Sequence, residues 1–177
     1  MYSDHELIEM ANKGDSEAFE TIYYRYRDRV YSLALRFTDN RHDALDVLQE
    51  TFIYILGKFP GFELTSSMTT FLYPVVKHIS FSIHQKNHRL AKENTPQSTS
   101  SIPVFNPPDD SLSELSAVLA VLPDQHREVV LMRFVDDMSL ADIAEALSTP
   151  LSTVKSRLYN ALETLRNDRR TKNYFLE

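Results

Sequence analysis

Hydrogen-bonding and cationic side chains concentrate along one predicted helix near the C-terminal end of the chain. They are Ser152, Thr153, Lys155, Ser156, Arg157 and Asn160. Lysine and arginine can bind phosphates or guanine edges, hydroxyls can bond to either, and asparagine suits adenine. The pattern predicts a helix that reads duplex DNA, with its N-terminal residues closest to the base edges.

The segment that must position this helix has the spacing of a helix-turn-helix. Ser139 with Asp142 predicts a capping box that opens a first helix of about two turns. Ala144 is small where a second helix has to cross closely, Ser148 falls in the turn, and Val154 faces inward. A glycine at the turn would be stronger evidence, so Ser148 departs from the usual pattern.

The second helix needs a start signal of its own. Thr149 or Ser152 is expected to cap it, with Pro150 tolerated in the first turn. A plain helical hairpin with a charged surface would explain the same charges. The coincidence of small residue, turn and caps favours DNA binding over that alternative.

Composition narrows the function classes. The chain has 177 residues, 42% of them hydrophobic and 25% charged, as in soluble globular proteins. Three glycines cannot build a glycine-rich phosphate loop, and the absence of cysteine excludes disulfides and thiolate metal sites. No signal peptide and no apolar run of about 18 residues is visible, so we expect a cytoplasmic protein without membrane insertion. No nucleophile–base–acid constellation is visible, so neither an enzyme nor a cofactor site is predicted.

The net charge of −6 is unevenly distributed. Residues 75–93 and 150–177 each carry +3, whereas 1–63, 94–124 and 125–149 carry −5, −4 and −3. Two basic stretches in an acidic chain suggest two contacts with phosphate, and the acidic faces are left for another partner. Chance variation on solvated helices is the alternative.

Apolar periodicity predicts an all-α fold of two small helical domains. A short helix opens with a capping box at Ser3 and ends near Gly14, and Asp15 caps a long one. A third helix follows Asn40, and a fourth spans roughly 68–92, with an irregularity expected at 70–74 because of Pro74. We expect the domains at 1–92 and 111–177. Residues 93–110, with four of the eight prolines, are expected to form a flexible linker.

Longer stretches of the sequence resemble a known family. LPDQHREVVLMRFVDDMSLADIAEALSTPLSTVKSRLYNALETLR is similar to the fourth conserved domain of sigma-70 family sigma factors of the extracytoplasmic-function (ECF) group. GDSEAFETIYYRYRDRVYSLALRFT, DALDVLQETFIYI and FLYPVVKHISFSIHQKNHR resemble the second conserved domain, in the right order and spacing. The resemblance implies an alternative RNA polymerase sigma factor. Such a factor would read the −35 promoter element with the helix-turn-helix and open the −10 element.

The resemblance also implies which residues meet each partner. The helix with Asp46, Gln49 and Glu50 would dock on the clamp helices of the largest subunit of core RNA polymerase. The following loop and the start of the next helix would grip the −10 element and hold an extruded base. The residues there are Phe62, Met68, Phe71, Tyr73, Lys77 and His78. Bases stack on rings while cations meet the backbone, although Phe71 and Tyr73 could equally be core residues.

Several positions depart from the family pattern. Phe71 replaces the usual tryptophan, Pro74 and His78 replace an arginine and an asparagine, and Leu45 replaces an acidic residue. The −10 reader is therefore expected to differ in base preference or melting strength. The resemblance further implies an anti-sigma factor that occludes the two domains, and we expect the free protein to be a monomer.

Three other functions would each explain part of the sequence. A stand-alone helix-turn-helix regulator would leave the N-terminal half unexplained, and net acidity would weaken its binding to DNA without polymerase. A sigma-like module that docks on polymerase without opening promoters is kept open by the departures at 71–78. His84 and His88 could share a cation, but no thiolate or third ligand is evident nearby, so no metal site is predicted.

Overall fold

The computed structural model describes residues 2–38, 40–94, 118–168 and 171. Within these ranges the regular elements are α-helices and no strand occurs, which confirms the predicted all-α fold class. The chain divides into two compact units, Met1–Phe105 (unit 1) and Asn106–Glu177 (unit 2). Residues 95–110 of the predicted linker lie outside the described residues, so the limits of the linker stay a prediction.

Local capping signals begin the first two helices. α1 spans Asp4–Asn12, and Ser3 and Glu6 form the predicted capping box. α2 spans Ser16–Thr38, and the Asp15 carboxylate accepts hydrogen bonds from the first-turn amides of Glu17 and Ala18. Both predicted helix starts are confirmed.

The next two helices complete unit 1. α3 spans Arg41–Leu56 and is capped by Asn40, whose side-chain oxygen accepts from the Asp43 amide at 2.7 Å. α4 spans Met68–Asn94 and runs through Pro74 without a break. The prediction of an irregularity at 70–74 is therefore wrong. Pro74 lies in the second turn of a helix that begins at Met68, and because it has no N–H it cannot donate the helix hydrogen bond to the residue four positions earlier.

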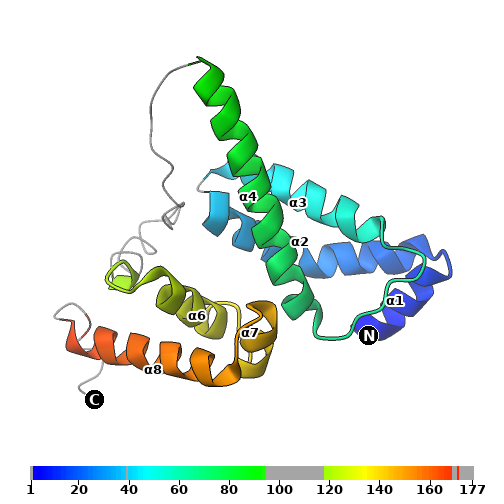
Figure 1. Ribbon diagram of the computed structural model, residues 1–177. Coiled ribbons are helices and arrows are strands. Elements are labelled where there is room, and N and C mark those ends of the chain that lie inside the picture. Colours follow the sequence, from blue (N-terminus) through cyan, green and yellow to red (C-terminus); the bar gives the residue numbers. More distant parts are fainter. Residues whose placement is uncertain (1, 39, 95–117, 169–170, 172–177) are drawn as a thin grey trace. The chain divides into compact units, whose positions relative to one another are not determined.

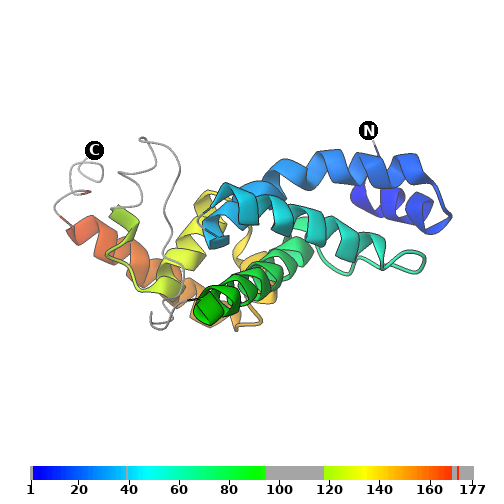
Figure 2. The same ribbon diagram turned by 90° about the horizontal axis from the view of Figure 1, so that it is seen from above.

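α2 is the central helix of unit 1 and contacts α1, α3 and α4 (Figure 1). The view from above shows α1 beside the N-terminal half of α2 (Figure 2). Apolar side chains from α1 to α4 close the core between them. Fully buried members are Leu7, Ile22, Val30, Val47, Ile55, Met68 and Val76.

Unit 2 contains α6 (Asp124–Phe134), α7 (Leu140–Ala146) and α8 (Leu151–Asn167), which contact one another. A cluster of buried side chains joins α6, α8 and the segment before α6: Leu119, Leu122, Val130, Leu131, Ala161 and Leu165. The Arg127 guanidinium donates to the carbonyls of Leu119 and Leu122 and fixes that preceding segment on α6. Among the described residues, no helix is long and apolar enough to cross a membrane.

Candidate nucleic-acid interface

The helix-turn-helix of unit 2 has the geometry that its sequence predicts. Ser139 caps α7, and the Asp142 carboxylate accepts from the Ser139 amide and hydroxyl in return. The turn then closes with a 2.9 Å hydrogen bond from the Thr149 amide to the Ala144 carbonyl. Ser148 adopts a φ of 48° in this turn. Because glycine is the residue that usually takes this left-handed conformation, the turn holds its shape at a conformational cost.

The start of α8 differs from the expectation. Pro150 is the N-cap residue and no side chain caps the helix, so the prediction of Thr149 or Ser152 as the cap is wrong. The Thr149 hydroxyl instead donates to the Leu147 carbonyl at 3.0 Å. Ser152 is already inside the helix. The Thr153 amide donates to the Pro150 carbonyl, and the amides of Leu151 and Ser152 at the very start of the helix can therefore meet a negatively charged group outside the protein.

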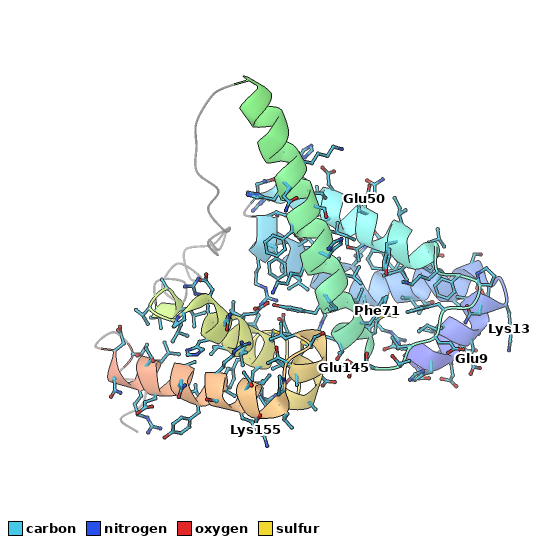
Figure 3. All side chains as sticks on the ribbon, viewed as in Figure 1. Glu9, Lys13, Glu50, Phe71, Glu145 and Lys155 are labelled. Atoms are coloured by element: carbon cyan, nitrogen blue, oxygen red, sulfur yellow. The ribbon has the colours of Figure 1, made fainter. Side chains whose placement is uncertain are left out.

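The predicted DNA-reading side chains divide by exposure. Ser152, Lys155, Ser156 and Asn160 are exposed, and Figure 3 shows Lys155 on the side of α8 away from α6 and α7. The other two predicted members, Thr153 and Arg157, are half-buried. Val154, predicted to face inward, is completely buried. α8 therefore has a polar face that is exposed to solvent and an apolar face that packs against the rest of unit 2.

Two residues on this face were not predicted. Tyr159 is 69% exposed and follows Lys155 by four residues, so both lie on one side of the helix. Leu151 is 40% exposed in the first turn. A tyrosine hydroxyl can bond to phosphate, and an apolar side chain can contact a thymine methyl group. The four-residue spacing from Lys155 would have identified Tyr159 in the sequence.

Three residues of the predicted −10 set belong to the core of unit 1. Phe62, Met68 and Tyr73 are 6%, 1% and 3% exposed, so they present no ring or thioether to a nucleic-acid strand in this structure. These three side chains pack in the core here, and their contact with a DNA strand stays a prediction. The ring of Tyr73 packs on Phe37 at a centroid distance of 5.9 Å.

The remaining members of that set lie at the surface of α4. Phe71 and Lys77 are half-buried and His78 is exposed. Pro74, on the same helix, is also exposed. Phe71 is thus the one aromatic ring of the predicted set that is partly open to solvent, with a cation six residues further along the helix.

Phe71 is also the last member of a series of touching rings. Phe19 on α2 packs edge-on against Phe59 at a centroid distance of 5.8 Å, and Phe59 packs edge-on against Phe62 at 5.5 Å. The rings of Phe62 and Phe71 are tilted against each other at 5.0 Å. The series joins the start of α2, the loop after α3 and the start of α4. Such contacts hold the loop by its aromatic side chains.

The predicted polymerase-binding residues lie on the outer face of α3. Asp46, Gln49 and Glu50 are all exposed, and Glu50 projects away from the body of unit 1 (Figure 3). Beside them is a hollow of about 390 Å³ between α2 and α3. It is lined by Phe19, Tyr23, Leu45, Leu48, Gln49, Phe52, Ile53 and Leu56. Leu45, Ile53 and Leu56 are each more than half exposed, so this face combines apolar and acidic groups.

One group of possible metal ligands occurs among the described residues. Ligand atoms of His42, Asp43 and Asp46 lie within 4.8 Å of one another at the start of α3. Asp43 is already engaged, because it accepts from the amides of Asn40 and Asn87. His84 is half-buried, and the side chain of His88 lies outside the described residues. Among the described residues, these side chains therefore do not form a convincing metal-binding site.

Each of the two units matches a known protein family. Residues 22–89 match the family described as Sigma-70 region 2, and residues 112–165 match Sigma-70, region 4. The chain is 28% identical to the "ECF RNA polymerase sigma factor SigW" of Bacillus subtilis (strain 168), covering 92% of this chain and 95% of that protein. It is 29% identical to the "ECF RNA polymerase sigma-E factor" of Haemophilus influenzae, covering 93% and 94%.

Two solved structures share the fold. "Structure of CnrH in complex with the cytosolic domain of CnrY" matches with a TM-score of 0.67 at 20% identity, covering 92% of this chain and 94% of that one. The sigma factor RpoE from Bartonella quintana, solved with the anti-sigma factor NepR, matches with a TM-score of 0.61 at 19% identity. That match covers 84% of this chain and 94% of the other.

Proposed function

We propose, from the premise that this chain belongs to the ECF group of the sigma-70 family, a division of labour between its two units. The protein is a promoter-specificity factor for RNA polymerase. In the proposal, α3 of unit 1 binds core polymerase, α8 of unit 2 reads the −35 element, and residues 61–78 hold the opened −10 element. The factor acts in the cytoplasm and has no catalytic activity of its own.

One observation supports this function above the others. The outer face of α8 carries Lys155, Ser156 and Tyr159 in a helix-turn-helix, and a separate helical unit carries an apolar and acidic face. A stand-alone DNA-binding regulator needs the first feature only. A factor that brings a second macromolecule to DNA needs both.

The chemistry of the α3 face suits a helical partner. An apolar ridge can fill the hollow lined by Leu45, Ile53 and Leu56, in the manner of a helix laid in a groove. Asp46 and Glu50 beside the hollow would then meet basic residues flanking that ridge, which favours fast and correctly oriented association. We assign this face to the clamp helices of the polymerase largest subunit.

The same face suits an inhibitor. Of two structures with this fold, one is CnrH in complex with the cytosolic domain of CnrY, and the other is the sigma factor RpoE in complex with the anti-sigma factor NepR. We infer that this protein also has an anti-sigma factor, and that the inhibitor competes with polymerase for the apolar hollow. Promoter binding would then depend on release of the inhibitor.

A second function is favoured by one observation. Phe62 and Tyr73 are buried, which leaves Phe71 as the only partly exposed ring of the predicted −10 set. A factor with so little aromatic surface could dock on polymerase and bind the −35 element without opening DNA. The two functions differ in whether thymines near the −10 element become unpaired.

Run-off transcription with purified core polymerase and a promoter library, with and without this protein, tests the proposal. New transcripts together with permanganate-reactive thymines support a full sigma factor, and Lys77→Ala should reduce that reactivity while −35 binding persists. Recruitment of polymerase without reactive thymines supports the docking module. Tight binding to promoter DNA without polymerase, and no opening when polymerase is added, would replace both with a stand-alone regulator.

A further inference from the structure

A single side chain fastens the start of the loop between α3 and α4. Asn12, at the C-terminal end of α1, accepts hydrogen bonds at its Oδ1 from the amides of Gly61 (2.7 Å) and Phe62 (3.0 Å). Its Nδ2 donates to the Phe62 carbonyl at 2.9 Å. The three bonds span about 50 residues of sequence and use both the oxygen and the nitrogen of the amide group, whereas an ionised carboxylate could only accept.

The backbone and the side chain at this point are held in different ways. Gly61 has a φ of 100°, a left-handed conformation that turns two consecutive amides toward Asn12. The Phe62 ring points into the core, 6% exposed, against Phe59 and Phe71. Asn12 therefore holds the backbone from one side while the rings hold the side chain from the other.

α1 itself is fixed in place, so Asn12 is a firm anchor. At the opposite end of α1, the Asp4 carboxylate accepts from the Arg25 guanidinium at 2.6 Å and from the Tyr26 hydroxyl at 2.5 Å. Leu7 and Ile8 between the two ends are buried. The loop at Gly61 is thus bonded to a helix that is itself held on α2 at both its start and its middle.

The far end of the loop is also tied down. The Ser67 hydroxyl accepts from the Thr70 amide at the start of α4, and the Arg29 guanidinium donates to the Thr69 hydroxyl at 3.0 Å. Between the two fastenings lie Glu63, Leu64, Thr65 and Ser66. All four are exposed or half-buried. The path of these four residues is therefore set by Asn12 at one end and by the start of α4 at the other.

We propose that Asn12 is a positioning residue for promoter opening. It acts through Gly61 and Phe62 to hold Glu63–Ser66 where an extruded base of the −10 element binds, and it touches no DNA itself. The inference rests on the proposed role of this loop. Asn12 lies in α1, before residues 22–89, which are the part of unit 1 that matches the family model.

Opening kinetics with three variants test the proposal. Asn12→Ala removes all three bonds, whereas Asn12→Asp keeps the two acceptor bonds and loses the donor. Lys13→Ala is the matched control for Asn12→Asp. Both substitutions lower the net charge by one, at neighbouring residues, but Lys13→Ala breaks none of the three bonds. The readouts are closed-complex affinity, core polymerase affinity, and the rate at which 2-aminopurine at the extruded position becomes fluorescent.

We expect Asn12→Ala to slow opening about tenfold, which is the size expected for the loss of one or two net hydrogen bonds. Closed-complex and core affinities should change less than about twofold. Asn12→Asp should fall between the wild type and Asn12→Ala, and Lys13→Ala should open like the wild type. Equal loss of closed-complex affinity and opening, or opening of Asn12→Ala at the wild-type rate, would overturn the inference. If the wild-type protein itself opens no promoter, the proposed function fails instead.

Discussion

The phenol of Tyr26 donates a hydrogen bond of 2.5 Å to the carboxylate of Asp4, joining α2 to the first turn of α1. Arg25 donates to the other oxygen of the same carboxylate. Burial raises the pKa of Tyr26 above its usual value, and the hydrogen bond to Asp4 and its negative charge raise it further. The neutral phenol is thus the form that the folded protein requires.

Tyr26→Phe should lower the free energy of unfolding by about 1–2 kcal/mol, because a half-buried hydrogen bond to a charged group is lost. Since the pKa of Tyr26 is raised in the folded state, its contribution is complete below the unfolded pKa of about 10 and is lost as pH rises above it. Urea titrations at neutral pH and above pH 10 measure both effects. Tyr24→Phe, which removes an exposed hydroxyl, is the control. A wild-type protein that loses no more stability than Tyr26→Phe at high pH would contradict this role.

Lys155→Ala and Arg157→Ala should each weaken binding of the polymerase complex to −35 DNA. The loss should be about 1–3 kcal/mol for a side chain that contacts a base, and the salt dependence should fall by about one unit of slope for a phosphate contact. Fluorescence anisotropy at several salt concentrations separates the two kinds of contact. Arg166→Ala is the matched control, because it removes an exposed cation from the C-terminal end of the same helix. Unchanged affinity in both variants would remove α8 from the DNA interface.

Phe62→Ala should destabilise unit 1 by about 3–5 kcal/mol, since the deleted ring leaves a cavity between Phe59 and Phe71. Chemical denaturation monitored by circular dichroism measures the change. Phe81→Ala is the comparison, because Phe81 is 37% exposed and its loss should cost clearly less. A Phe62→Ala protein of wild-type stability with a defect only in DNA opening would return Phe62 to the strand-binding set.

Asp46→Lys with Glu50→Lys should weaken binding to core polymerase and leave thermal stability nearly unchanged. Both side chains are exposed, and exposed charges contribute little to folding but strongly affect association. Glu9→Lys with Glu145→Lys makes the same change of net charge at other exposed positions (Figure 3). Affinity is measured without DNA. Equal losses in the two double variants would show that only net charge matters.

Limited proteolysis of the free protein should cut first within 93–110, as the proline- and hydroxyl-rich composition predicts. Two fragments of helical circular dichroism should remain. Mass spectrometry locates the cuts, and a digest of the polymerase-bound protein shows whether the partner protects the segment. First cleavage inside α2 or α8 would contradict the predicted domain limits.

Signals carried by neighbouring residues were readable in the sequence. The capping residues Ser3 and Ser139 begin their helices as predicted, because a cap depends on a spacing of two or three residues, whereas the cap predicted for α8 at Thr149 or Ser152 is absent. The burial of Phe62 and Tyr73 was not readable. In the sequence, an aromatic residue beside cations looks the same whether its ring faces solvent or the core. The ring of Tyr73 packs on Phe37, which is distant in sequence, and the ring of Phe62 packs on Phe59, which is close in sequence but lies in a loop without periodicity. Asn12 was missed for the same reason, since its partners lie about 50 residues away.

The ring series from Phe19 to Phe71 has a consequence for how variants combine. Phe19 lines the apolar hollow on the α2–α3 face, and consecutive ring contacts through Phe59 and Phe62 connect it to Phe71 on α4. Side chains that belong to one network of contacts give non-additive free energies, typically by about 0.5–3 kcal/mol. Substitutions at these two positions should therefore be epistatic although 52 residues separate them. A double-mutant cycle on Phe19 and Phe71 measures the interaction free energy between the two positions. A large value would mean that the partner-binding face and the DNA-binding segment cannot change in sequence independently of each other.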